Sequence, residues 1–229
     1  MRMNGKFSIV ATPIGNLEDI TLRALRVLKE ADVIFCEDTR MTKKLLGHYD
    51  IHIPTKRYDA HASDARHEEI IERLTAGERV ALVSDAGTPA ISDPGFKIID
   101  LVRRTLPEVT IEAIPGPSAL AAALSVAGMP TASFTFFGFL PHKKGRETLF
   151  REIAAQEHAS VFYESPHRLM KALTSLKTTL SEERQIAVVR ELTKIHESVV
   201  RGSAGEVCAY FEAHPDQVRG ECVVIVASS

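Results

Sequence analysis

Residues 79–95 read RVALVSDAGTPAISDPG, and this stretch decides the fold class. Its first five residues form a short apolar run of the kind that becomes a buried β-strand. A loop rich in glycine, proline and serine follows, and Asp93 and Pro94 then supply a helix N-cap and a proline at the first helical position. We therefore expect a strand, a tight loop and a helix over residues 94–106.

The same order of strand, loop and helix recurs on both sides of this stretch. Apolar runs at residues 7–12, 32–36 and 109–114 predict strands. Residues 21–31, 40–48 and 68–76, and an alanine-rich segment that Gly128 ends, predict helices. Strands and helices alternate in this way when a mostly parallel sheet is covered on both faces, so the N-terminal part is predicted to be an α/β domain.

The alternation breaks at residues 134–141, FTFFGFLP, which precede a basic run at residues 142–146. We place a domain boundary just before this break, which gives domains at residues 1–132 and 133–229. In the second domain we expect helices at residues 146–155, 166–176 and 205–211 and strands at residues 160–163, 185–190, 197–200 and 222–227. Successive strands without a helix between them predict a mixed sheet.

Composition limits the class of protein. The chain has 229 residues, a net charge of −2 and 45% hydrophobic residues, as ordinary globular proteins do. A net charge near zero counts against a strongly basic nucleic-acid binder but is compatible with a local basic face. The three cysteines, Cys36, Cys208 and Cys222, form no CxxC pair and indicate reduced thiols in a cytoplasmic protein. We expect no targeting segment, no membrane span and no metal site.

The candidate ligand site follows from the fold class. In an open parallel sheet, ligands bind outside the carboxyl ends of the strands, here at residues 12–17, 37–40, 84–95 and 115–119. Each loop alone resembles an ordinary strand-to-helix turn, but four at one edge of a sheet indicate a binding cleft. The GxGxxG and Walker signatures are absent. Free backbone N–H groups in these loops suit a cofactor that carries a carboxylate and a ribose.

Several blocks of the sequence resemble one family. They are SIVATPIGNLED at residues 8–19, CEDTR at 36–40, LVSDAGTP at 82–89, IPGPS at 114–118, GFLP at 138–141, FYES at 162–165 and RELTK at 190–194. These blocks are similar, in type and order, to those of the ribosomal RNA small subunit methyltransferase I family. That family belongs to the tetrapyrrole (corrin/porphyrin) methylase superfamily. The resemblance runs from about residue 7 to residue 226.

The resemblance implies two α/β domains of the tetrapyrrole methylase type with S-adenosyl-L-methionine in the cleft between them. It also implies a cytoplasmic homodimer that methylates the 2′-oxygen of a decoding-centre cytidine ribose in the 16S rRNA of the small ribosomal subunit. The family usually continues into a small basic helical domain, which we expect to be absent here because the sequence stops at Ser229. The family also shows His-Asn where this sequence has His61 and Ala62.

Carried over position by position, the resemblance implies cofactor contacts from loops of both domains, mostly through backbone groups. The residues are Pro13, Gly15, Gly87, Thr88, Pro89, Ala90, Ser118, Ala119, Tyr163, Glu164, Glu191, Leu192 and Glu221.

Methyl transfer to a hydroxyl requires an in-line approach to the methyl group and removal of the hydroxyl proton. Charged residues at the predicted strand ends are the candidates for a base or a stabilising cation: Asp38, Arg40, Asp85, Glu164, Arg190 and Lys194. The candidates for RNA contact are basic: Arg40, Lys43, Lys143, Lys144, Arg146, Arg190 and Lys194. Arg190 and Lys194 either contact RNA phosphates, or Arg190 pairs with a carboxylate such as Glu164 and only stiffens the site.

Two other functions remain open at this stage. One keeps the fold and the cofactor but methylates a tetrapyrrole of the precorrin or uroporphyrinogen type. The other is a non-catalytic partner in assembly that binds the cofactor without turnover.

Overall fold

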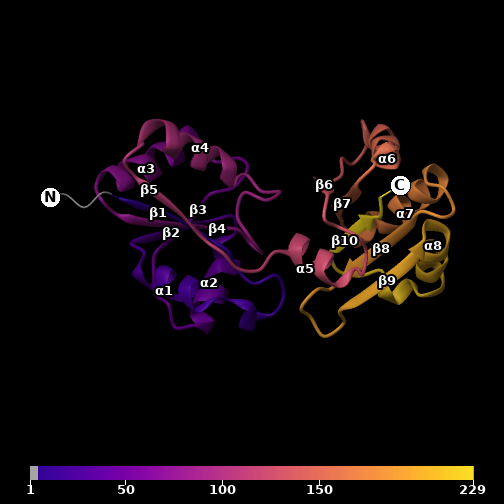
Figure 1. The fold of residues 1–229 in the computed structure, drawn as a ribbon. Helices are drawn as coiled ribbons and strands as arrows, with labels where there is room; N and C mark the ends of the chain where they lie inside the picture. Colours follow the sequence, from indigo (N-terminus) through magenta and orange to yellow (C-terminus); the bar gives the residue numbers. More distant parts are fainter. Residues whose placement is uncertain (1–4, 229) are drawn as a thin grey trace. The chain divides into compact units, whose positions relative to one another are not determined.

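The fold was analysed in a computed structural model that describes residues 5–228 (Figure 1). The chain forms two compact units that meet in sequence after Ser118, and each is described by itself. This point lies earlier than the boundary expected at residue 132. The reason is that helix α5 (Ala119–Val126) contacts strand β10 (Cys222–Val226) and therefore groups with the second unit.

The first unit contains a five-stranded sheet in the order β3-β2-β4-β1-β5, and every strand pair in it is parallel. The strands are β1 (Lys6–Val10), β2 (Val33–Cys36), β3 (Thr55–Arg57), β4 (Arg79–Val83) and β5 (Thr110–Ile114). The predicted parallel sheet is thus confirmed. Parallel pairing brings the carboxyl ends of all five strands to one edge.

Four helices cover the two faces of this sheet, with α3 and α4 on one side and α1 and α2 on the other (Figure 1). Phe35 packs toward the first pair and its neighbour Ile34 toward the second, as the two-residue period of a strand requires. A 3₁₀ turn, η1 (Leu17–Asp19), precedes the first helix. The helices are α1 (Leu22–Glu30), α2 (Thr39–His48), α3 (Asp64–Thr75) and α4 (Gly95–Thr105).

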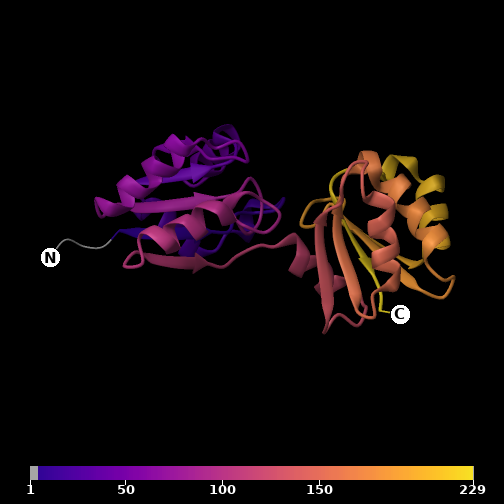
Figure 2. The same ribbon diagram turned by 90° about the horizontal axis from the view of Figure 1, so that it is seen from above.

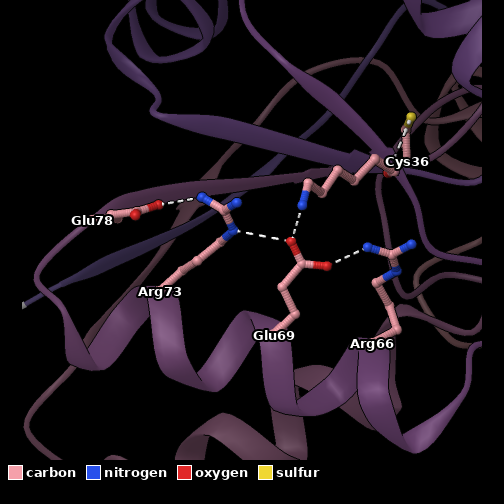
Figure 3. Close-up of polar contacts among 6 residues, drawn as sticks. Cys36, Arg66, Glu69, Arg73 and Glu78 are labelled. Carbon is pink, nitrogen blue, oxygen red and sulfur yellow. Dashed lines mark hydrogen bonds and ion pairs between the residues drawn. The ribbon is translucent and has the colours of Figure 1, made fainter.

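Strand β3 was not predicted, because its three residues, Thr55, Lys56 and Arg57, carry no apolar pattern. Long-range contacts place it instead. Its backbone pairs with β2, and the ammonium of Lys56 donates to the carboxylate of Glu69 on α3. Figure 3 shows Glu69 between Arg66 and Arg73, which also donate to it. Burial raises the pKa of Glu69, but the bonds from Lys56 and Arg73 outweigh this effect and hold the pKa below its usual value.

The second unit contains a mixed sheet, as predicted; it has five strands in the order β6-β7-β10-β8-β9. Strand β6 runs parallel to β7, and the other pairs are antiparallel. Helices α6, α7 and α8 pack on one face of this sheet (Figure 2). The remaining elements are β6 (Phe134–Phe139), α6 (Arg146–Ala155), β7 (Ala159–Glu164), α7 (Pro166–Thr179), β8 (Gln185–Arg190), β9 (Ser198–Ser203), α8 (Ala204–Ala213) and η2 (Pro215–Gln217).

The aromatic stretch at residues 134–141, interpreted from the sequence as a break in the alternation of strands and helices, contains a strand. Its residues Phe134–Phe139 form edge strand β6, whose pairing with β7 is irregular between Phe136 and Phe139. Gly138 supplies the left-handed backbone, φ +61°, that this irregularity needs. The rings of Phe136 and Phe139 consequently both contact Tyr163, at centroid distances of 5.0 and 5.3 Å.

Over residues 5–228, none of the helices has the length and the apolar character that crossing a membrane demands.

Candidate active site

The loops after β1 and β4 are joined by backbone hydrogen bonds. The Thr12 N–H donates to the Gly87 carbonyl at 2.9 Å, and the Gly87 N–H donates to the Thr12 carbonyl at 3.0 Å. The buried hydroxyl of Thr12 donates to the carbonyl of Ser84 at 3.2 Å. The two loops, which are far apart in sequence, thus form one connected backbone surface at the edge where the sequence predicted a site.

The loop after β5 is tied to the same surface. The hydroxyl of Thr88 donates to the Pro117 carbonyl at 3.1 Å. Gly87 has φ +81°, and a Cβ added there would lie 3.3 Å from the Ile14 side chain. A Cβ added at Gly116 would lie 3.0 Å from the Ala11 Cβ. Glycine at both positions therefore favours this close approach of the loops.

The end of the loop at residues 84–95 has an unusual backbone. Ala90 and Ser92 have φ values of +70° and +65°, a region that side chains other than glycine rarely adopt. Both oxygens of Asp93 hold this turn, because they accept the N–H groups of Ala90 and Gly95 at 2.7 Å each. Strained turns of this kind persist where the surrounding structure fixes them and often occur at ligand sites.

Acidic side chains gather where β2 and β4 end. The Asp38 N–H donates to Asp85 at 2.9 Å, and the carboxylate of Asp38 accepts the guanidinium of Arg40 at 2.7 Å. Hydrogen bonds from Arg40 lower the pKa of Asp38 to about 2. Half-buried Glu37 differs, because burial raises its pKa; from the described residues 5–228 its carboxylate accepts one long hydrogen bond, 3.5 Å from the Asp85 N–H.

Glu37 was not among the sequence candidates for a base, although it follows a buried strand directly and is close in sequence to two candidates, Asp38 and Arg40. Its burial depends on how the loops after β2 and β4 pack, which the order of residues does not reveal. Asp38 and Arg40 were candidates, and the structure pairs them with each other at the surface, with 89% of the Arg40 side chain exposed. Glu37 carries no such ion pair in the described part of the chain, whereas the carboxylate of Asp38 is engaged by Arg40.

In the second unit, the carboxylate of Glu164 ends β7 and is fully buried. Arg146 donates to one oxygen at 2.6 Å, and Arg168 lies 2.8 Å from the other. The same two arginines also donate to the carbonyls of Pro141 and Leu140, at 3.2 and 3.3 Å. The cluster thus fixes the start of the loop at residues 140–145.

This cluster decides where several sequence candidates lie. Arg146 is only 8% exposed and is engaged with Glu164, whereas Lys143 and Lys144 are exposed on the loop that it anchors. Both oxygens of Glu164 are occupied by arginine, so this side chain is not a free base. Arg190 forms no ion pair with it in the described part of the chain, which contradicts the alternative that Glu164 is its partner.

The loop between β8 and β9 brings other candidates together. Glu191 and Thr193 have φ values of +52° and +66°. The carboxylate of Glu191 lies 2.9 Å from the ammonium of Lys194, so this lysine is paired and half-exposed. The Thr193 N–H donates to Glu197 at 2.6 Å. These contacts fix the loop in a strained conformation.

Three other cofactor candidates of the second unit lie near the ends of its strands: Tyr163 in β7, Leu192 after β8 and Glu221 before β10. Tyr163 is half-buried beside the β6 aromatic rings, and burial raises the pKa of its hydroxyl. Leu192 is buried and Glu221 exposed. Within residues 5–228, no group of three or more histidine, cysteine or acidic side chains is arranged to hold a metal ion.

Solved structures share this fold. A cobalt precorrin-4 methyltransferase superposes with a TM-score of 0.69 at 18% identity, covering 97% of this chain and 94% of that one. A uroporphyrin-III C-methyltransferase from Thermus thermophilus, solved with S-adenyl homocysteine, has a TM-score of 0.63 at 21% identity and covers 97% of each chain. The sequence matches the Tetrapyrrole (Corrin/Porphyrin) Methylases over residues 6–208. The chain belongs to this family.

Within the family, one group of relatives is much more similar to this chain. The protein named Ribosomal RNA small subunit methyltransferase I of Thermotoga maritima is 43% identical over 223 residues, which are 97% of this chain and 98% of that protein. The protein of the same name from Xylella fastidiosa is 45% identical over 227 residues, 99% of this chain and 82% of that protein. The resemblance found in the sequence motifs is thereby confirmed.

Proposed function

We propose that this protein is an S-adenosyl-L-methionine-dependent methyltransferase that acts on the RNA of the small ribosomal subunit. The observation that carries the proposal is the joined set of loops at the carboxyl edge of the first sheet, held by the Thr12–Gly87 bridge. An identity of 43–45% to relatives named for this activity, over nearly the whole chain, supports the choice of substrate.

The cofactor is proposed to contact mainly backbone groups, both of these loops and of residues in the second unit. In the first unit the contacts are Pro13, Gly15, Gly87, Thr88, Pro89, Ala90 and Ser118, and in the second Ala119, Tyr163, Glu164, Glu191, Leu192 and Glu221. Turn shape is the relevant property, because glycines, prolines and positive φ angles set it at several of these positions. Glu164 would contribute its backbone, since its side chain is engaged by two arginines.

The finer proposal is transfer to the 2′-oxygen of a decoding-centre cytidine of 16S rRNA. When bound, S-adenosyl-L-methionine supplies the methyl group to the ribose hydroxyl, whose proton must pass to a base. Glu37 is proposed as that base, because Asp93 uses both oxygens on backbone amides and Asp38 is held by Arg40. Exposed Lys43, Lys143 and Lys144 would contact RNA phosphates.

The proposal includes a cytoplasmic location and a homodimer. Buried, free Cys36, Cys208 and Cys222 fit a reducing compartment. The oligomeric state is measured by light scattering on the purified protein.

Methyl transfer from labelled S-adenosyl-L-methionine tests the substrate. Small ribosomal subunits that lack the modification and a uroporphyrinogen-type tetrapyrrole are offered in parallel. Label in 16S rRNA, at a cytidine whose 3′ phosphodiester bond then resists alkaline cleavage because its 2′-oxygen is methylated, is the expected result. Label only in the tetrapyrrole would mean that the proposed RNA substrate is wrong and the proposed cofactor is right. Cofactor binding without methyl transfer to either substrate would indicate a non-catalytic partner.

A further inference from the structure

Four side chains of the second unit form one row across the carboxyl end of β7 and β8. Strand register places Glu164 opposite Cys222, Cys222 opposite Arg190, and Arg190 opposite Ser198. Directly paired residues project to the same face of a sheet, so the four side chains are neighbours in this order. The row lies on the face that α6, α7 and α8 cover.

Arg190 differs from the other buried arginines of this unit. Arg146 is 8% exposed and donates to Glu164 and a backbone carbonyl. Arg184 is 7% exposed and donates to three backbone carbonyls. Arg190 is also 7% exposed, yet within residues 5–228 its buried Nε atom has no partner and its guanidinium makes no ion pair. This buried Nε–H group requires an explanation, because a buried donor without a partner is unfavourable, whereas the two Nη atoms are not among the buried atoms that lack one.

Its neighbour in the row has the same defect. The Ser198 hydroxyl is buried and has no hydrogen-bond partner among the described residues. A third such atom, the Thr193 hydroxyl, belongs to the loop that the Arg190–Ser198 pair closes. Three of the six such atoms among the described residues therefore lie in one hairpin, beside a strained loop; the other three are on Asp19, Thr55 and Ser160.

Among residues 5–228, no acidic side chain forms an ion pair with Arg190. Glu164 already serves two arginines, and Glu191 is paired with Lys194. Cys222 lies between Glu164 and Arg190, but burial raises the pKa of its thiol to about 12, so it is neutral at physiological pH. Glu221 is exposed. The buried edge thus carries more positive charge than its carboxylates offset.

We propose that Arg190 and Ser198 form a buried binding site for an oxyanion, a carboxylate or a phosphate group. A guanidinium offers several donors in a planar fork that matches such a group, and a serine hydroxyl adds one more donor. The oxyanion has two sources under the proposed function, on which this inference rests: the amino-acid carboxylate of the cofactor and a phosphate of the RNA. One oxyanion would satisfy both unpartnered groups.

The source is identified by calorimetry on the full chain with two probes. S-adenosylhomocysteine carries the carboxylate, whereas 5′-methylthioadenosine keeps the nucleoside and the sulfur without it. If the cofactor is the source, Arg190→Gln binds S-adenosylhomocysteine about tenfold more weakly and 5′-methylthioadenosine as the wild type does. If RNA is the source, both probes bind normally, and the logarithmic salt slope of binding to small ribosomal subunits falls by about one.

Two further variants separate ligand binding from folding. Ser198→Ala removes an unpartnered buried hydroxyl, so the unliganded protein should melt no lower than the wild type while the same ligand binds more weakly. Arg184→Gln is the matched control: it is equally buried but fully partnered, so it should lower the Tm and leave ligand affinity unchanged.

Normal affinity and salt slope in Arg190→Gln would overturn the site. So would parallel losses for both nucleoside probes together with a lower Tm, which would make Arg190 a structural residue. Failure of the wild-type protein to bind S-adenosylhomocysteine at all would count against the proposed function instead.

Discussion

Gly220 lies against Glu191 so closely that a Cβ added to Gly220 would stand 1.7 Å from the Oε1 atom of Glu191. Gly220 also has φ +71°, which adds strain to any substitution. The segment before β10 therefore depends on glycine to leave room for the Glu191 carboxylate, which in turn holds Lys194.

Gly220→Ala should displace Glu191 and weaken binding of S-adenosylhomocysteine, because Glu191 and Leu192 are proposed cofactor contacts. Calorimetry should show at least a tenfold loss, the size expected for a hydrogen bond to a charged group. Gly47→Ala is the control, since Gly47 is helical and a Cβ there meets nothing within 4 Å. That variant should gain about 0.5–1 kcal/mol of stability and bind normally. Equal affinities in both variants would contradict the proposed contacts.

Gly87→Val should abolish cofactor binding. A β-branched side chain at φ +81° is strained, and its Cβ would crowd Ile14 where the loops after β1 and β4 meet. The measurement is a calorimetric titration, with circular dichroism to show that the sheet is intact. Wild-type affinity in a folded Gly87→Val protein would remove this loop from the site.

Glu164→Gln should destabilise the protein by about 3–5 kcal/mol, because it leaves buried Arg146 and partly buried Arg168 without their counter-charge. The matched control is Asp100→Asn, which breaks an exposed pair with Arg104. Such pairs are worth about 0–1 kcal/mol. Urea unfolding of both variants checks the contrast, and limited proteolysis should cut the loop at residues 140–145 faster in Glu164→Gln. A small loss in Glu164→Gln would mean that the arginines find other partners.

The pH dependence of methyl transfer should report Glu37. As a base it must be deprotonated, so activity should fall with decreasing pH through its pKa, which burial places above that of an ordinary carboxyl group. Glu37→Gln should lose most activity and with it this acidic limb. The matched variant is Asp38→Asn. The carboxyl group of Asp38, with a pKa of about 2, does not titrate in the assay range, so its removal should leave the acidic limb in place. An unchanged acidic limb in Glu37→Gln would exclude it as the base.

The stability that Glu37 contributes should depend on pH in the opposite sense to the activity. A carboxyl group whose pKa is raised on folding contributes stability that is fully present below its unfolded pKa and is lost as pH rises through its folded pKa. Removing Glu37 should therefore make unfolding less dependent on pH in the mildly acidic range. Urea midpoints measured across that range for wild type and Glu37→Gln provide the check.

The parallel core of the first unit could be predicted because strands such as β4 are uninterrupted apolar runs bounded by glycine and aspartate. Strand β3 could not, because Lys56 is placed by a distant carboxylate on α3. Strand β6 lies at an edge and contains an irregularity, so its residues lack a clean two-residue alternation.

The same distinction applies to the site. The four loops were predicted because glycine and proline mark turns locally. The ion pairs of Glu164 with Arg146 and Arg168 were not predicted, and the alternative that pairs Arg190 with Glu164 was wrong, because ion pairs depend on which strands become neighbours. Basic residues therefore looked alike in the sequence, although Lys143 is exposed, Arg146 is buried and paired, and Arg190 is buried and unpaired.

The bridge between Thr12 and Gly87 is made by peptide groups alone. Such a link does not depend on which side chains surround it, apart from the glycine that permits the approach. Side chains around the loops can then be exchanged over evolutionary time while the backbone surface they border keeps its shape. The loops proposed to receive the methyl donor would then keep their shape while their surroundings change to suit another methyl acceptor.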